Sequence, residues 1–488
     1  MRPVLIDPAP QSATQSATPS AAPVVATPEQ RRTLAMASAG TLLVLVTFVT
    51  PLATGVRTTV SLGAGPGTQA WLLSAMSVGL AAALLTAGVL ADDVGRRRVF
   101  TGGLVLVGIG AGAVAVAPSS GLFIAARLVE GVGAAAVIAC ALGLIGHAFP
   151  MGPARSRATA VWGASVGAGT GLGGLVTVGL DHGAGWRTTY VVTAVAAVVL
   201  AGLGRVVLIE SVGRTERRVD VAGVVLLAAG VSALLAGLVQ SRGGWGGVTV
   251  VLLGAGVLLL AAFVVAERRA TTPMIDLSLF AVPGFVAATL GAFITGVAVI
   301  GPASYLPTTM QRGLGESLLV ATLLVLVWSA ASTVTALGVR WFPALDGRRL
   351  LVIGLGLSAV GLAALGVLGP HADGARLLPG LIVLGVGYGA ANAALGREAV
   401  AHVPVARAGM GSGANNTARY IGAAVGTTLV VLVTSSAGAA GTPAGLVAGW
   451  NVAAYAGAVV SLLGAVLIGL LRPSPVRALV PQTGEARA

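Results

Sequence analysis

Charged side chains are scarce in this chain of 488 residues, since Asp, Glu, Lys and Arg together make up only 9% of it. Soluble domains carry about 25% charged residues. Here 56% of the residues are hydrophobic and the mean hydropathy is +0.94. These values exclude a water-soluble enzyme or binding domain, and they predict an all-α polytopic membrane protein.

Cysteine and histidine are also nearly absent. The single cysteine, Cys140, lies inside an apolar run, so no disulfide or cysteine metal cluster can form within the chain. The four histidines lie near the ends of apolar runs without metal-binding spacing. We find no nucleophile elbow, phosphate-binding loop or zinc motif. We therefore expect no metal, no other cofactor and no enzymatic activity, and an ATP-driven pump is disfavoured.

Lysine is missing altogether, and all 29 basic residues are arginine. In a soluble protein this excess of positive charge would indicate nucleic-acid binding, but these arginines are spread over short loops between apolar runs. Fourteen runs have about the 20 residues that a membrane helix needs. Alternating sides along the chain put twenty arginines in loops on one side and five on the other. Because the cytoplasmic side carries the excess, we expect fourteen membrane helices, both termini in the cytoplasm and no nucleic-acid partner.

The runs group as six, two and six. Residues 33–210 are expected to form an N-terminal six-helix bundle, 211–283 two inserted helices and a linker, and 284–471 a C-terminal six-helix bundle. Residues 1–32 are rich in Pro, Ala, Ser and Thr, which is typical of a disordered tail. Residues 472–488 form a second cytoplasmic tail.

The loop after the second run reads GVLADDVGRRR. Asp92 marks where the helix leaves the membrane, and Gly95 permits a tight turn. Arginines enter hydrocarbon at a cost of about 3 kcal/mol each, so Arg96 and Arg97 mark the cytoplasmic side. With Gly88, these residues resemble the signature loop that follows the second helix in major facilitator superfamily transporters. A plain positively charged hairpin loop is the alternative.

The resemblance implies a fold of two parallel six-helix bundles that rock about a substrate site near the middle of the membrane. It also implies that the loop acts as a cytoplasmic gate. Asp92 would then bind an arginine or a helix N-terminus of the facing bundle.

The fourth run carries Arg127 and Glu130 well inside the membrane. At i, i+3 spacing they share one helix face and can pair. The run resembles the family motif R-x-x-Q-G-x-G-A-A, with Glu130 where Gln is usual, and the resemblance links the arginine to proton coupling. We expect a protonatable pair in the cavity, and a purely structural ion pair is the alternative.

The fifth run is rich in glycine. Gly169, Gly173 and Gly174 resemble the antiporter motif G-P-x-x-G-G, which is associated with exporters, although Thr170 replaces the proline. Simple close packing of helices is the alternative.

The thirteenth run, which begins at Gly409, carries Asn415, Asn416 and Arg419 at spacings that share a helix face. It resembles the G-x-x-S-G-x-x-N-x-x-R-x-x-G pattern of the fourteen-span drug:proton antiporter branch. We expect these side chains in the central cavity, with bonding to neighbouring helices as the alternative.

One departure from that branch concerns the first run, which has no acidic residue where relatives usually carry one. Cationic dyes are therefore not expected as the main substrate, and Glu130 is the best remaining carboxylate for coupling. Taken together, the sequence predicts a plasma-membrane transporter that acts as a monomer and exports small amphipathic drugs or antibiotics by proton antiport. Its partners would be the substrate, protons and the lipid bilayer. Metabolite uptake or facilitated passage stays open because of Thr170 and the acid-free first run, and so does a membrane sensor that has lost transport.

Overall fold

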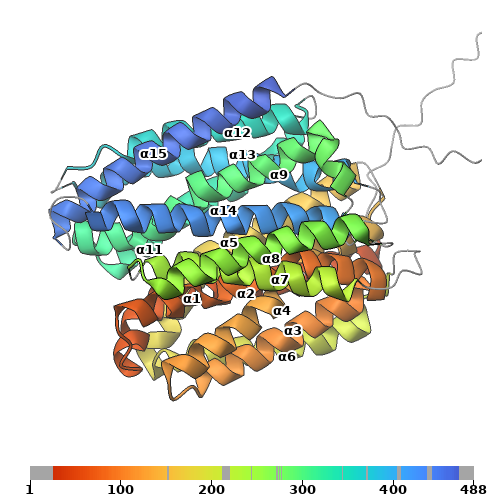
Figure 1. Cartoon of the computed structure of the whole chain (residues 1–488), viewed down its shortest axis with the longest axis horizontal. Coiled ribbons are helices and arrows are strands. Elements are labelled where there is room, and N and C mark those ends of the chain that lie inside the picture. Colours follow the sequence, from red (N-terminus) through yellow and green to blue (C-terminus); the bar gives the residue numbers. More distant parts are fainter. Residues whose placement is uncertain are drawn as a thin grey trace, which may run out of the picture.

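The computed structural model describes residues 26–150, 153–211, 220–242, 244–270, 273, 275, 277–342, 345–369, 372–403, 408–436 and 442–471. All regular elements in these ranges are helices (Figure 1). They are α1 (Pro28–Ser61), α2 (Pro66–Val94), α3 (Arg96–Ala115), α4 (Ser120–Ala148), α5 (Pro153–Ala184), α6 (Arg187–Val207), α7 (Val221–Ser241), α8 (Gly247–Arg269), α9 (Pro283–Thr295), α10 (Gly301–Thr308), α11 (Leu318–Gly338), α12 (Gly347–Leu365), α13 (Leu378–Ala401), α14 (Ala408–Ser436) and α15 (Pro443–Leu470).

The number of membrane helices agrees with the sequence. Thirteen described segments are long and apolar enough to cross a bilayer. In one of them, Pro283–Gly313, a wider π-helical turn joins α9 to α10 and a second one follows α10, so that the segment forms a single span. The glycine-rich α5, with 32 residues, adds a further helix of similar length. With α5 included, the number of long helices among the described residues is close to the number of spans predicted.

Local capping sets where the first helix begins. Thr27 and Gln30 form a reciprocal capping box, and Pro28 occupies the first helical turn. Consequently α1 starts at Pro28, before the apolar run itself, and residues 28–32 of the expected tail are helical. The rest of that tail, residues 1–25, lies outside the described residues, as do most of the linker (212–219) and the tail at 472–488.

The helices pack into an N-terminal group, α1–α6, and a C-terminal group, α9–α15, which lie on opposite sides in Figure 1. One large apolar core is drawn only from residues between Met36 and Leu208. Two others are drawn from residues between Ala287 and Ile468. The exact boundaries of the two bundles stay a prediction.

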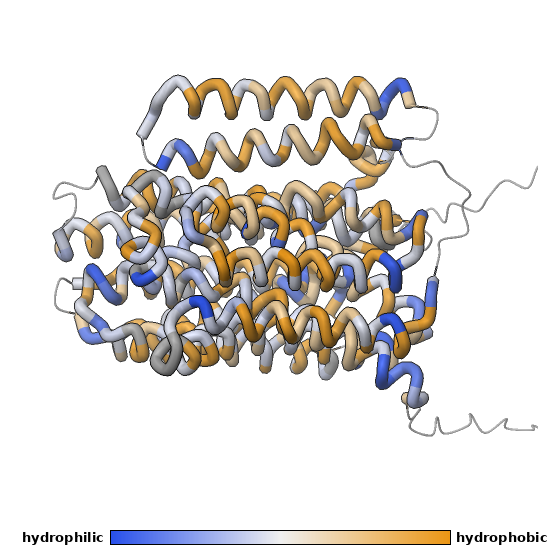
Figure 2. The backbone as a smooth tube through the Cα atoms, turned by 90° about the horizontal axis from the view of Figure 1, so that it is seen from below, coloured by the Kyte–Doolittle hydropathy of each residue, from blue (hydrophilic) through white to orange (hydrophobic). Residues whose placement is uncertain are grey.

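The inserted helices α7 and α8 form a hairpin that lies along one side of the molecule (Figure 2). α7 packs against both α2 and α14, and a shared apolar core joins these elements. Most side chains of α8 are exposed, including Val250, Val257 and Leu258 at 60% or more. One side of α8 packs on α7, and its exposed side is largely apolar, as in a helix that faces lipid.

The two groups meet through two long helix pairs, α2 with α14 and α5 with α11. Small residues allow the helices to approach closely. At Gly413 of α14, an added Cβ would lie 2.9 Å from the Leu85 Cα of α2.

Candidate functional site

The centre of the N-terminal group holds a buried ion pair. Arg127 and Glu130, both on α4, have side chains that are 1% and 0% exposed, and Arg127 Nη1 lies 2.7 Å from Glu130 Oε2. Thr47 of α1 donates its hydroxyl to Glu130 Oε1 at 2.5 Å. Arg127 Nη1 also donates to the Thr47 carbonyl at 3.1 Å. The pair therefore ties α4 to α1.

The sequence missed Thr47, because nothing in the first run marks which of its threonines faces α4. The other side of Arg127 is aromatic, with its guanidinium carbon 5.7 Å from the centre of the Tyr190 ring on α6. Tyr190 also packs edge-on against Phe123 and Trp186. The ion pair thus lies away from bulk solvent, where charges interact strongly.

The predicted gating loop connects α2 to α3 at their cytoplasmic ends. Gly88 is buried in the last turns of α2, and Gly95 ends that helix with φ +119°, a conformation that favours glycine. Asp92 accepts from Arg96 Nη2 at 2.8 Å and, through its other oxygen, from the Met410 backbone N–H at 3.3 Å. Met410 lies in the first turn of α14, so Asp92 contacts a helix N-terminus of the other group.

The remaining arginines of this loop face a carboxylate that the sequence reasoning missed. Glu210, just after α6, accepts from the Arg97 backbone N–H at 3.0 Å and lies near the side chains of Arg97 and Arg98. A Cβ at Gly95 would collide with Glu210, at 2.5 Å from Oε1. The sequence did offer a signal for Glu210. It is an isolated acidic residue at the cytoplasmic end of a span, on the same side of the membrane as three consecutive arginines.

Arg419 lies in α14, about 16 Å from the cytoplasmic end of that helix at 1.5 Å per residue. Its guanidinium donates to the side-chain oxygen of Asn416 and, at 2.6 Å, to that of Asn392 on α13. Asn415 does not join them, because its amide donates to the Ala288 carbonyl of α9 at 3.2 Å. Sequence spacing missed Asn392, which lies on a different helix.

The glycines of α5 have two different neighbours. Gly169 and Gly173 face α1. A Cβ added at Gly169 would lie 2.9 Å from Leu42 O, and a Cβ added at Gly173 would lie 2.9 Å from Val46 Cα. Gly171 and Gly174 face α11, with added Cβ atoms 2.7 Å from Leu326 Cδ1 and 3.1 Å from Thr322 Cγ2. Glycine on both faces places α5 tightly between α1 and α11, which belong to different groups.

At the outer end, the α7–α8 hairpin joins the two groups. Arg242, which follows α7, donates to Ser74 of α2 at 2.9 Å and to Thr428 of α14 at 3.3 Å. Burial lowers the pKa of its guanidinium to about 10, so it stays charged at neutral pH. Trp71 of α2 donates to Gln240 of α7 at 3.1 Å beside it.

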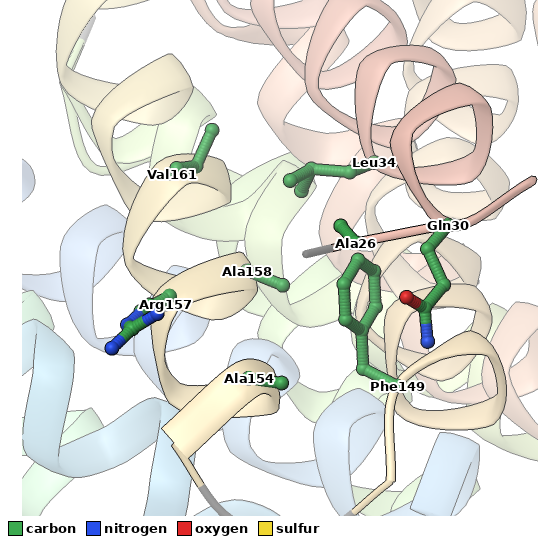
Figure 3. Close-up of a pocket in the computed structure, with 8 residues that line it drawn as sticks. All are labelled: Ala26, Gln30, Leu34, Phe149, Ala154, Arg157, Ala158 and Val161. Atoms are coloured by element: carbon green, nitrogen blue, oxygen red, sulfur yellow. The ribbon is translucent and has the colours of Figure 1, made fainter. Parts of the chain in front are cut away.

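A small cavity of about 220 Å³ lies at the cytoplasmic side of α1, α4 and α5 (Figure 3). Apolar side chains such as Leu34, Phe149 and Val161 line it, together with Gln30 and Arg157. Sites for drug-sized ligands are usually larger, about 300–1,000 Å³. The cavity contains none of the residues singled out from the sequence.

A family model described as Major Facilitator Superfamily matches residues 33–427. The chain belongs to this superfamily. This transporter is 33% identical over 477 residues to the cephamycin export protein CmcT of Amycolatopsis lactamdurans, covering 92% of this chain and 94% of that one. It is 32% identical over 363 residues to the multidrug resistance protein Stp of Mycobacterium tuberculosis, and the match covers 73% of this chain and 67% of that one.

The fold of this major facilitator protein is shared with the human organic anion transporter MFSD10, with a TM-score of 0.67 at 17% identity, covering 91% of this chain and 100% of that one. Family, fold and relatives confirm the predicted drug-efflux branch and a multi-pass location in the cell membrane. The roles of the individual site residues stay predictions.

Proposed function

We propose that this protein exports small amphipathic drugs or antibiotics by proton antiport, through alternating access between bundles formed by residues 33–210 and 284–471. The observation that carries the proposal is the ion pair of Arg127 and Glu130, which lies on the membrane helix α4 and is buried among the helices of the N-terminal group. Charges at such depth are costly and mark proton or substrate pathways. A carboxylate in this position can take up one proton and so change the net charge of the site.

The contacts of Glu130 support a route from protonation to movement. Protonation would remove the negative charge that Arg127 faces and weaken the bonds through which Thr47 holds α1 to α4. α1 packs on the Gly169 and Gly173 face of α5, and α5 packs on α11 in the other bundle. Proton binding would therefore act on the bundle interface through three adjoining helices.

The contacts of Arg419 favour an anionic substrate. Its guanidinium is held by the neutral amides of Asn392 and Asn416, which leave its positive charge uncompensated by these partners. A charge inside the membrane favours a counter-ion, and the carboxylate of an amphipathic antibiotic could supply it. The acid-free first apolar run and the relative named for cephamycin export point the same way.

The contact between Asp92 and Met410 supports a gate at the cytoplasmic ends of α2 and α14. It would break when the transporter opens inward. Both halves of the gate belong to one chain, so a monomer suffices.

The test uses inverted membrane vesicles with an acidic interior, which expose the cytoplasmic face. We expect a cephamycin to be taken up in preference to a cationic dye, and uptake to collapse when the gradient is dissipated. Glu130→Gln should abolish the gradient-driven component, whereas Glu29→Gln, the same change at an exposed position near the start of α1, should not. Uptake of the cephamycin that is indifferent to the gradient would contradict proton antiport and favour facilitated passage.

A further inference from the structure

We propose that the side chains of Thr47, Thr50, Thr54 and Thr58 line a file of water molecules that carries the coupling proton from the outer surface to Glu130. This inference rests on the proposed coupling role of Glu130. It adds a route that runs inside the N-terminal bundle, separate from the bundle interface where the substrate would pass.

The four threonines form one continuous stripe on α1. Their spacings of three, four and four residues keep them within an arc of about 80° on a helix of 3.6 residues per turn. The stripe is about 16 Å long at 1.5 Å per residue, and Thr58 lies in the last turn of α1 at its outer end. None of the four residues is more than 2% exposed. Hydroxyl groups therefore extend through the bundle interior from the level of Glu130 nearly to the surface.

The helices around α1 add polar groups along this stripe. Thr50 Oγ1 lies 3.3 Å from Thr177 Oγ1 of α5, and the side chain of Thr177 is fully buried. The Tyr190 side chain of α6 lies next to Thr54 and within the field of Arg127 and Glu130. The file thus has polar groups from three helices, in a region where apolar side chains would be the ordinary filling of a membrane protein.

Several of these buried polar atoms have no protein partner among the described residues. They are Thr58 Oγ1 at the outer end of the stripe, and Nε and Nη2 of Arg127 at its inner end. Leaving a buried donor unpaired costs about 1–3 kcal/mol, and buried polar groups normally pair with protein or ordered water. From unpaired atoms at both ends of one polar stripe we infer water along its length.

The hydroxyls that do have partners suit this role. Thr50 and Thr54 donate to carbonyls of their own helix, Val46 O at 2.9 Å and Thr50 O at 3.1 Å. Their oxygens therefore remain available as acceptors for water. In the transfer, the innermost water gives a proton to the Glu130 carboxylate, each water is restored by the one outside it, and the outermost takes a proton from solution. The net change is one proton moved onto Glu130.

The test follows protonation of Glu130 directly and needs no substrate. The full chain is reconstituted with its outer face outward, the external pH is stepped from alkaline to acidic, and the carboxyl infrared band that Glu130→Gln removes is recorded with time. We expect Thr54→Val to slow the appearance of the band about tenfold or more, because one lost hydrogen bond raises the barrier accordingly. Thr54→Ser, which keeps the hydroxyl, should restore the wild-type rate.

Thr59→Val is the matched control on the same helix, since its hydroxyl bonds Gly55 O at 2.7 Å and lies outside the stripe. It should leave the rate unchanged. Thr58→Val provides a second test at the outer end if Thr54→Val fails to fold. A wild-type rate in folded Thr54→Val or Thr58→Val overturns the water file and leaves the proposed function standing. The absence of any Glu130 band in the wild type overturns both.

Discussion

Replacing Asp92 by Asn tests the gate, because the two oxygens of this carboxylate have two different partners. One accepts from Arg96 at 2.8 Å, and the other accepts from the Met410 N–H at the start of α14 at 3.3 Å. Asn has the same size but no charge. The substitution therefore weakens both contacts without creating a cavity.

The two contacts differ in what they control. Arg96 belongs to the same loop as Asp92, so their ion pair exists whether or not the bundles meet. Losing a partner of a buried pair costs about 3–5 kcal/mol, and this loss should appear as reduced thermal stability. The Met410 contact exists only while the cytoplasmic ends are closed. A charge at a helix N-terminus contributes about 0.3–2 kcal/mol, and a loss of about 1 kcal/mol shifts a two-state equilibrium about fivefold.

The assay measures that shift by the distance between two spin labels. Cys140 is the single cysteine and is buried, so Cys140→Ala gives a clean background. Labels would be placed at Val94→Cys and Arg349→Cys, exposed positions at the cytoplasmic ends of the two bundles. We expect Asp92→Asn to enlarge the long-distance population about fivefold.

Arg96→Gln is the matched control. It removes the ion pair but leaves the Asp92 charge on the N-terminus of α14, so it should lower thermal stability without enlarging the long-distance population. If Asp92→Asn leaves the distance distribution unchanged, the Met410 contact does not gate the transporter.

Two further predictions concern the packing of the bundles. Gly173→Ala places a Cβ 2.6 Å from a Val49 methyl group on α1, so we expect a destabilisation of about 1–3 kcal/mol and slower drug uptake. Gly179→Ala is the control, because the space around Gly179 is open, and it should change neither thermal unfolding nor uptake. Arg242→Gln removes a charged donor to Ser74 and Thr428. Since hydrogen bonds to charged groups contribute about 1.5–3 kcal/mol, spin labels on the outer ends of α2 and α14 should report a wider separation in this variant. An unchanged separation would show that the hairpin does not hold the bundles together there.

Sequence patterns predicted the features that depend on neighbours along the chain. The turn at Gly95 follows from its position between Asp92 and the arginines, and its φ of +119° agrees. Arg127 and Glu130 pair because i, i+3 spacing puts them on one face of any α-helix. Asn416 and Arg419 meet for the same reason, whereas Asn415 bonds another helix, which is the alternative that the sequence left open for these residues.

By itself, then, the sequence determined that the chain crosses a membrane many times, which side of the membrane its loops occupy, and where its buried charges lie. These features follow from hydropathy, arginine bias and helical periodicity, which act over one or two turns. The tertiary structure alone decided that Thr47 binds Glu130, that Glu210 faces the arginine loop and that Asn392 holds Arg419. Each of these partners comes from another helix or from the segment that follows one, and which faces of two helices meet is set by close packing of small and large side chains across the whole bundle.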